Sequence, residues 1–258
     1  MHRRHRIRFT VKAYKKVWRQ GLLSKMEDME VPYRFRNFAR SFLSSRRAEV
    51  EVNGRRSRKV YLNEGLPQGS SLSPMLFVVF INDIGVDLDP KTTESLFADD
   101  TSIWQCGPKD ATRKKPDEVR QDIGEEMQKE VDKILEWANK WKMTINADKT
   151  KALIISTSSG DRSWNPKIKL EEEKLKTSSE YKFLGFTIDN QLRFNKHVDN
   201  VVGKAKKRVN LLKCMAAKDW GNSMDLQRIL YVQYVRSTLE YASFNWSPWI
   251  SETALKKL

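Results

Sequence analysis

The stretch Leu96–Trp104, LFADDTSIW, places two adjacent carboxylates, Asp99 and Asp100, inside an apolar run. The apolar residues on both sides predict two short strands joined by a tight turn, with the carboxylates at its tip. A turn is needed because successive side chains on a straight strand point to opposite faces. Two carboxylates this close repel each other unless a cation neutralises them. The stretch therefore indicates a magnesium site, and a solvated turn between two strands is the alternative.

Basic residues are concentrated at the beginning of the chain. The 258 residues carry a formal net charge of +15, and Met1–Val60 holds eighteen Lys and Arg residues against five Asp and Glu residues. This asymmetry indicates a polyanionic partner, most commonly nucleic acid, with a solvated basic face as the alternative. The length suits one large domain or two smaller ones.

The cysteines and the apolar runs indicate the cellular compartment in which the protein is expected. Cys106 and Cys214 are far apart and have no histidine cluster near them, so they indicate neither a zinc site nor a disulfide framework. No apolar run approaches the length of a membrane span, and the basic start, MHRRHRIRF, lacks the apolar core of a signal peptide. We therefore expect no membrane insertion and no secretion, and an intracellular location in the cytoplasm or the nucleus.

Two helices and a hairpin are predicted before residue 64. Apolar residues at helical spacing predict helices over Arg19–Met29 and from Pro32 onward. Between Ala48 and Leu62, apolar residues alternate with charged ones and predict a hairpin with a basic tip, Arg55–Arg58. The tip is either a solvated loop or a grip for phosphates.

A glycine-containing loop, EGLPQGSSLSP, occupies Glu64–Pro74. Glycine lets the backbone of such a loop approach a ligand closely. We expect Ser73 to be the N-cap and Pro74 the first residue of an apolar helix over Met75–Ile84. An ordinary loop entering a buried helix is the alternative, but the short connection to the Asp pair favours a shared site.

After the Asp pair, helical and extended patterns alternate until the chain becomes helical. Pro116 begins a long amphipathic helix whose apolar stripe extends to Trp141. The further predicted elements are strands at Met143–Ile145 and Leu153–Ile155, a short hairpin at Ile168–Leu175, a strand at Tyr181–Ile188, and helices over about 195–217 and 224–239. The change of character places a domain boundary near Asn190.

Taken in order, the motifs GLPQGSSLSP, LFADD, INADKTK and YKFLG resemble the reverse transcriptase domain of non-LTR retrotransposons, in the jockey-like or LINE-like group of RNA-directed DNA polymerases. The resemblance extends from about Thr10 to Leu258. It implies an α+β fold: a right-hand polymerase palm, an antiparallel sheet backed by helices, over residues 1–190, and an incomplete helical thumb over 191–258. It also implies an N-terminally truncated copy whose fingers are largely missing. A group II intron maturase is a less favoured relative.

The resemblance further implies partners and individual roles. The partners are an RNA template, a DNA primer and a dNTP, with Mg²⁺, or Mn²⁺ in its place, as the cofactor of an in-line phosphoryl transfer. The oligomeric state is left open. The implied roles are catalysis and metal binding for Asp99 and Asp100, nucleotide and template binding for Gln68, Gly69 and Lys149 (with Lys151 as the alternative lysine), and a primer grip for Phe183, Leu184 and Gly185.

One motif departs from the family pattern. The family has a run resembling D-[LF]-S-K-A-[FY]-D-x-V-W, and Lys12–Trp18 matches its end. Counting back places Phe9 where the first metal aspartate stands and Lys15 where the second acidic residue stands. A lost carboxylate and an added cation weaken the binding of divalent ions. We therefore expect impaired polymerisation or, alternatively, a catalytically dead nucleic-acid-binding remnant of a mobile element.

Overall fold

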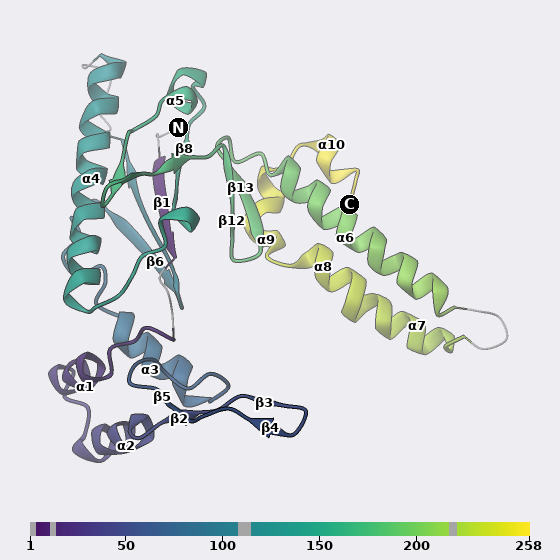
Figure 1. The fold of residues 1–258 in the computed structure, drawn as a ribbon. Helices are drawn as coiled ribbons and strands as arrows, with labels where there is room; N and C mark the ends of the chain where they lie inside the picture. The colour runs from purple at the N-terminus through teal and green to yellow at the C-terminus, as the bar shows by residue number, and fades with distance from the viewer. Residues whose placement is uncertain (1–3, 11–13, 108–114, 217–220) are drawn as a thin grey trace. The chain divides into compact units, whose positions relative to one another are not determined.

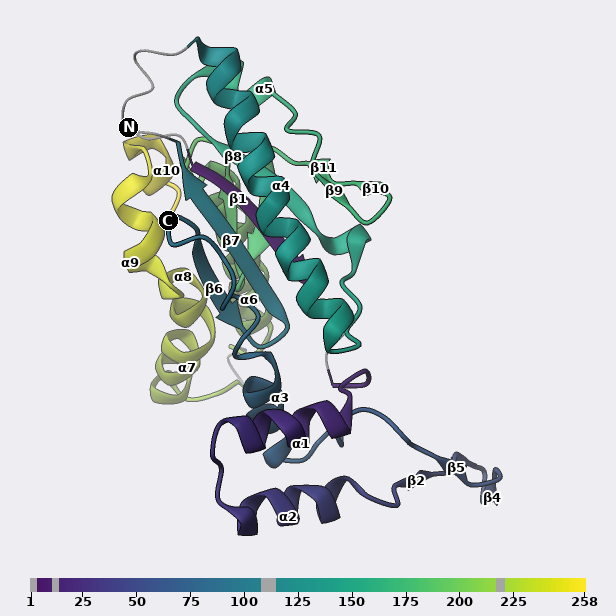
Figure 2. The ribbon, with the colours of Figure 1, turned by 90° about the vertical axis from the view of Figure 1, so that its left-hand side faces the viewer.

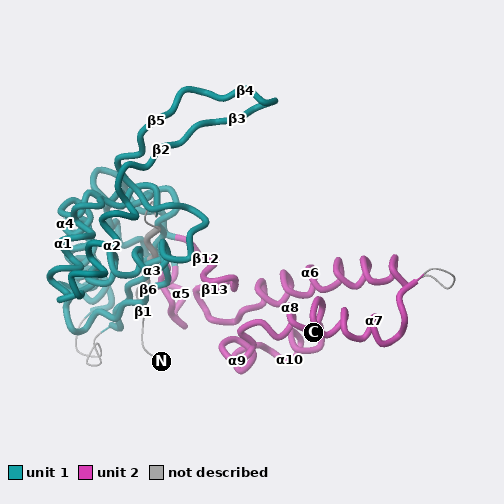
Figure 3. The backbone as a smooth tube through the Cα atoms, turned by 90° about the horizontal axis from the view of Figure 1, so that it is seen from below, with its two compact units in different colours: residues 1–152, 163–177 teal, residues 153–162, 178–258 magenta. Residues whose placement is uncertain are grey.

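The computed structural model describes residues 4–10, 14–107, 115–216 and 221–258, and its contacts divide the chain into two units. Unit 1 comprises residues 1–152 and 163–177, and unit 2 comprises residues 153–162 and 178–258 (Figure 3). The predicted boundary near Asn190 lies inside unit 2. The contacts divide the chain earlier because the strands just before Asn190 pack against the first long helix of unit 2.

A five-stranded sheet has the order β11-β8-β1-β7-β6 and lies mostly in unit 1, whereas residues 153–155 of β8 belong to unit 2 (Figures 1 and 2). The strands are β1 (Arg4–Thr10), β6 (Thr93–Phe97), β7 (Asp100–Cys106), β8 (Lys151–Ile155) and β11 (Lys176–Thr177). β7 pairs antiparallel with β1 and with β6. The expected antiparallel sheet holds for these three strands, whereas β11 runs parallel to β8. The predicted strand at Met143–Ile145 is reduced to a bridge at Ile145.

The long helix α4 (Pro116–Lys140) lies across one face of this sheet (Figure 2). It begins at the expected proline, and its buried residues recur at helical spacing, from Val119 through Ile123 and Met127 to Ile134. Ile7 of β1 and Ile103 of β7 belong to the same buried cluster. An amphipathic stripe of this width is what a helix needs to cover a sheet. The core of unit 1 therefore lies between the sheet and α4.

Three helices and a two-stranded arm complete this part of unit 1. They are α1 (Arg19–Asp28), α2 (Tyr33–Leu43), α3 (Leu72–Ile81), and the short strands β2 (Arg47–Ala48), β3 (Glu51–Val52), β4 (Arg55–Arg56) and β5 (Val60–Tyr61). α3 begins earlier than expected, and the proposed cap at Ser73 is wrong. Ser73 is inside the helix, and its hydroxyl donates to the Pro67 carbonyl at 2.5 Å.

A buried lysine joins α1 to α3 and α4. The Lys25 ammonium donates to the Phe80 carbonyl at 2.7 Å, forms an ion pair with Asp83, and lies 3.9 Å from the centre of the Trp141 ring. Trp137 donates to the same Asp83 carboxylate at 2.9 Å. Burial lowers the pKa of Lys25, and its bond to Asp83 acts in the opposite direction. The cation is retained in an apolar setting because it is paired and surrounded by aromatic rings.

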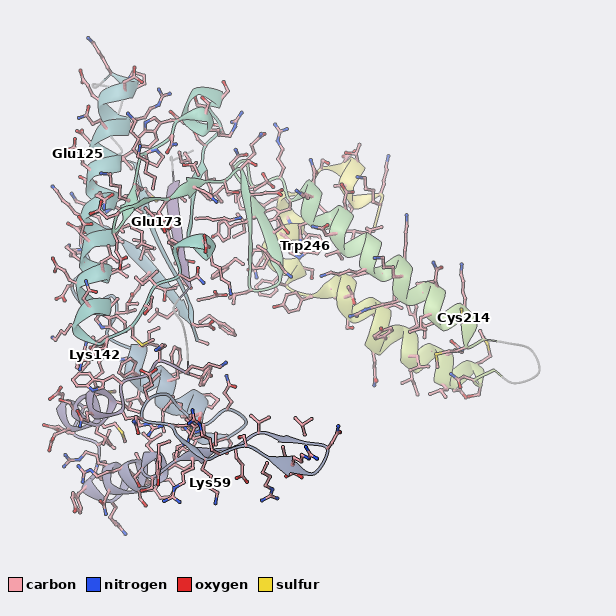
Figure 4. The ribbon with its side chains drawn as sticks, viewed as in Figure 1. Lys59, Glu125, Lys142, Glu173, Cys214 and Trp246 are labelled. Atoms are coloured by element: carbon pink, nitrogen blue, oxygen red, sulfur yellow. The ribbon has the colours of Figure 1, made fainter. Side chains whose placement is uncertain are left out.

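Unit 2 combines a hairpin with helices. Its elements are α5 (Ser159–Ser163), β12 (Glu180–Phe183), β13 (Phe186–Asp189), α6 (Asn195–Cys214), α7 (Met224–Leu230), η3 (Tyr231–Arg236), α8 (Ser237–Glu240), α9 (Ser243–Trp246), η4 (Ser247–Trp249) and α10 (Glu252–Leu255). The expected single strand at Tyr181–Ile188 is wrong: Leu184 and Gly185 have φ of +44° and +91° and fold it into a hairpin. Trp246, labelled in Figure 4, is buried against this hairpin's cluster. None of the described helices is both long and apolar enough to cross a bilayer.

His197 is a buried titratable group in unit 2. Only 2% of it is exposed, its Nδ1 accepts from the Thr187 amide at 3.3 Å, and its ring meets Phe186 and Trp246 edge to face. Burial lowers the pKa of His197, and the charge of Lys204 lowers it further. The folded state therefore favours the neutral ring, whereas the unfolded chain takes up a proton below about pH 6.5.

We accordingly expect the thermal unfolding midpoint of the chain to fall as the pH is lowered from about 7 to about 5. The reason is that the unfolded state binds the proton that folded His197 resists. His197→Asn retains an acceptor for Thr187 but does not titrate, so its midpoint should be lower at neutral pH and flatter across this range. Equal slopes for the two proteins, measured by circular dichroism, would show that His197 does not control this dependence.

Candidate active site

The Asp pair lies at a two-residue hairpin turn, as expected. Phe97 pairs with Asp100 across the strands, which leaves Ala98 and Asp99 as the turn. Ala98 has φ of +50°, a region that favours glycine, so the turn holds a strained residue next to the carboxylates. Both aspartates are half-buried. The turn thus presents one carboxylate from its tip and one from the first residue of β7.

The strand next to this hairpin is β1, and its end meets the Asp pair. Thr10 pairs with Asp100, and Phe9 pairs with Thr101. Backbone register therefore places Phe9, where the resemblance expects an aspartate, opposite Thr101 and one residue before the partner of Asp100. The backbone of β1 thus ends at the Asp hairpin.

The glycine loop is attached to the chain just after β1. The Gly65 amide donates to the Val17 carbonyl at 2.9 Å, and the Leu66 amide donates to the Tyr14 carbonyl at 2.5 Å. The Arg19 guanidinium donates to the Gly65 carbonyl at 3.0 Å. A Cβ on Gly65 would lie 2.6 Å from the Lys15 carbonyl oxygen, so only glycine permits this close approach.

These contacts place the loop and the Asp pair at one end of unit 1. Tyr14 follows Thr10 by four residues, and a chain of that length spans at most about 14 Å. Figures 1 and 2 both show the turn of the β6–β7 hairpin at the end of the sheet that faces α3, the helix into which the loop leads. Gln68 and Gly69 are exposed on this loop, and Gly69 has φ of +84° with open space around it.

Lys149 lies in a short 3-10 helix that packs against β1. This helix, η2 (Ala147–Lys149), is held by Asn146, whose side-chain oxygen accepts from the Lys149 amide at 3.3 Å. Lys149 is exposed, whereas Lys151 is the half-buried first residue of β8. Both lysines belong to unit 1, as does the Asp pair. Exposure favours Lys149 as the one that can reach a phosphate.

The predicted primer grip belongs to unit 2. Phe183 is buried, and Leu184 and Gly185 form the turn of the β12–β13 hairpin. Tyr241, which no sequence motif singles out, contacts this turn: its hydroxyl donates to the Leu184 carbonyl at 2.8 Å, and its ring lies 3.0 Å from a Cβ placed on Gly185. No local pattern identifies Tyr241, because 57 residues separate it from Leu184.

The acidic ligands at the hairpin turn are Asp99 and Asp100. No group of three or more His, Cys, Asp or Glu side chains capable of holding a metal occurs among them. The strand position next to the pair carries Phe9, and Lys15 lies a short way beyond. A two-ion site needs carboxylates that bridge both ions. Asp99 and Asp100 could bind one ion, but this donor set does not fit the two that the resemblance implies.

Comparison with known proteins agrees with this arrangement of motifs. Residues 10–188 match the family described as reverse transcriptase (RNA-dependent DNA polymerase), and the chain belongs to this family. It is 28% identical over 195 residues to the RNA-directed DNA polymerase from mobile element jockey of Drosophila melanogaster, covering 73% of this chain and 20% of that protein. The probable RNA-directed DNA polymerase from transposon X-element of the same organism is 25% identical over 237 residues, covering 91% and 25%.

The chain thus spans about a fifth to a quarter of the length of these curated relatives. Among solved structures, apo telomerase from Candida tropicalis truncated from its C-terminal domain aligns with a TM-score of 0.50 and 13% identity, over 73% of this chain and 34% of that one. This likeness concerns the fold. The α+β class and the membership of a jockey-like reverse transcriptase domain, both predicted from the motifs, are confirmed.

Proposed function

We propose that the chain is the nucleic-acid-binding polymerase domain of a non-LTR retrotransposon protein, and that its own nucleotidyl transfer is impaired. The observation that carries this proposal is the pairing of the end of β1 with the Asp hairpin. It supports the alignment of Phe9 with a lost metal aspartate. The family and its named relatives supply the substrate class: an RNA template, a DNA primer and a dNTP.

Within unit 1, we assign the exposed Gln68–Gly69 turn to the nucleotide and the template base, and Lys149 to phosphates. The backbone of such a turn can lie against a base because Gly69 has no side chain. In unit 2, the Leu184–Gly185 turn, with Tyr241 beneath it, is assigned to the primer strand. The palm and thumb correspond in this proposal to units 1 and 2, and the protein acts inside the cell, in the cytoplasm or the nucleus.

The alternative, a catalytically dead remnant that binds nucleic acid, is favoured by the incomplete donor set. Both versions predict affinity for an RNA–DNA primer–template. The net charge of +15 should make this affinity fall steeply between about 50 and about 200 mM salt, because binding releases counterions from the phosphates.

Fluorescence anisotropy with a labelled primer–template tests the shared prediction. We expect tight binding at low salt and a linear fall of log affinity with log salt. Asp99→Asn should bind at least as tightly as the wild type in the absence of divalent ions, because it removes a charge that repels phosphates. Undetectable binding at low salt, or an affinity that salt leaves unchanged, contradicts the proposed function.

A further inference from the structure

A basic arm extends from unit 1 and packs against little else. We define the arm as residues 47–61, which comprise β2, β3, β4 and β5 and project from the body of unit 1 (Figures 1 and 3). Its strands pair through Arg47 with Tyr61 and through Glu51 with Arg56, and every residue from 47 to 61 is exposed. A two-stranded ribbon without a packed face is only marginally stable in water.

The arm carries free positive charge. Five Lys and Arg residues stand against Glu49 and Glu51 in this segment. Arg56 is engaged by both glutamates, at 3.3 Å and 3.0 Å. Within the described part of the chain, the remaining cations on the distal arm form no ion pair. They are Arg55, Arg58 and Lys59, the last of which is labelled in Figure 4.

The arm also exposes an aromatic ring and apolar side chains. Tyr61 is 59% exposed, and the Arg47 guanidinium lies 4.9 Å from the centre of its ring. Val50 and Val52 are exposed on the same ribbon. Unpaired bases stack on tyrosine rings and on arginine planes, whereas a duplex keeps the faces of its bases hidden. Cations interleaved with such a ring therefore favour a single strand over a duplex.

We propose that the basic arm is a docking site for single-stranded nucleic acid, with Arg55, Arg58 and Lys59 on phosphates and Tyr61 against a base. The occupant follows from charge complementarity together with the exposed ring. This inference rests on the proposed binding of nucleic acid by the whole chain, and it adds a contact that lies outside the motifs of the Asp hairpin and the glycine loop.

The test compares two triple variants that lose the same charge. The arm triple is Arg55→Ala, Arg58→Ala and Lys59→Ala; the control triple is Lys91→Ala, Lys129→Ala and Lys174→Ala, which removes exposed lysines elsewhere in unit 1. The probes are a labelled single-stranded RNA, the DNA of the same sequence, and a duplex. For the arm triple, we expect the slope of log affinity against log salt to decrease by about 2, since each phosphate contact on a single strand contributes about 0.7.

The aromatic contact has a separate signature. Tyr61→Leu should weaken single-strand binding about tenfold while leaving the salt slope unchanged, because stacking releases no counterions. Tyr33→Leu, at another exposed tyrosine of unit 1, should have little effect. Unfolding midpoints equal to that of the wild type establish that the variants are folded, as expected for exposed side chains.

The outcomes distinguish a failure of the proposal for the arm from a failure of the proposed function. A loss confined to RNA identifies RNA as the occupant and a loss confined to DNA identifies DNA; either supports the proposal, as do equal losses on both single strands. An arm triple that binds like the control triple overturns it, and so does an equal loss on the duplex. If the wild type binds none of the probes, the proposed function itself fails.

Discussion

Replacing Phe9 with aspartate should raise primer extension by at least about 100-fold over the wild-type chain. β1 ends beside the Asp hairpin, with Thr10 opposite Asp100 and Phe9 opposite Thr101. The resemblance to the family run puts a metal aspartate at residue 9, so we expect a carboxylate there to add an acidic ligand to Asp99 and Asp100. Neutralising the charge that develops on a transferred phosphoryl group is worth several kcal/mol, and about 1.4 kcal/mol corresponds to a factor of ten in rate.

The matched control is Phe9→Asn, which has the size of aspartate but no ionised oxygen. Both variants remove the same aromatic ring, so any loss of stability is shared, and the difference between them isolates the carboxylate. Incorporation should be measured on one primer–template with Mg²⁺ and with Mn²⁺. Equal incorporation by Phe9→Asp and Phe9→Asn would mean that residue 9 does not belong to the metal site.

The second large effect is expected at Gly65, where the glycine loop meets the chain after β1. Gly65→Ala should lower the free energy of unfolding by about 2 to 5 kcal/mol. About 1 to 2 kcal/mol of this comes from holding alanine at φ of +77°. The remainder, about 1 to 3 kcal/mol, comes from a Cβ that would lie within 2.7 Å of the Tyr14 and Lys15 carbonyl oxygens. The loop that carries Gln68 should also become displaced.

Gly69→Ala separates these two contributions. Gly69 has φ of +84°, but a Cβ at this position would have nothing within 4 Å, so alanine there carries the backbone strain without the clash. Chemical denaturation of both variants gives the comparison. If Gly69→Ala is as destabilising as Gly65→Ala, the attachment of the loop to Tyr14 and Lys15 does not constrain the fold as described.

Features of this fold with a strong local signal could be predicted from the sequence. The Asp hairpin, the helix beginning at Pro116 and the ribbon turning at Asn53 and Gly54 all follow from patterns within a few residues. In each case the turn or the periodic stripe is specified by neighbouring residues. The order of the motifs along the chain could also be read from the sequence alone, and it identified the family.

Features set by distant contacts could not be predicted in this way. β1 showed no clear period, and its central place in the sheet comes from pairing with a strand about 90 residues later. Phe35 and Phe38 have helical spacing, yet both are exposed, because α2 buries Ala39 and Leu43 instead.

Two contacts between distant residues likewise depend on tertiary structure. They are the contact of Tyr241 with Leu184 and that of Gly65 with Lys15.

The most direct test is a primer-extension assay with the wild-type chain on an RNA–DNA primer–template that it is shown to bind, with Mg²⁺ or Mn²⁺. We expect a bound primer that is extended little or not at all, because no group of three or more potential metal ligands occurs among the described residues. Robust incorporation by the wild type that Asp99→Ala abolishes would contradict this: the hairpin carboxylates would then suffice for catalysis.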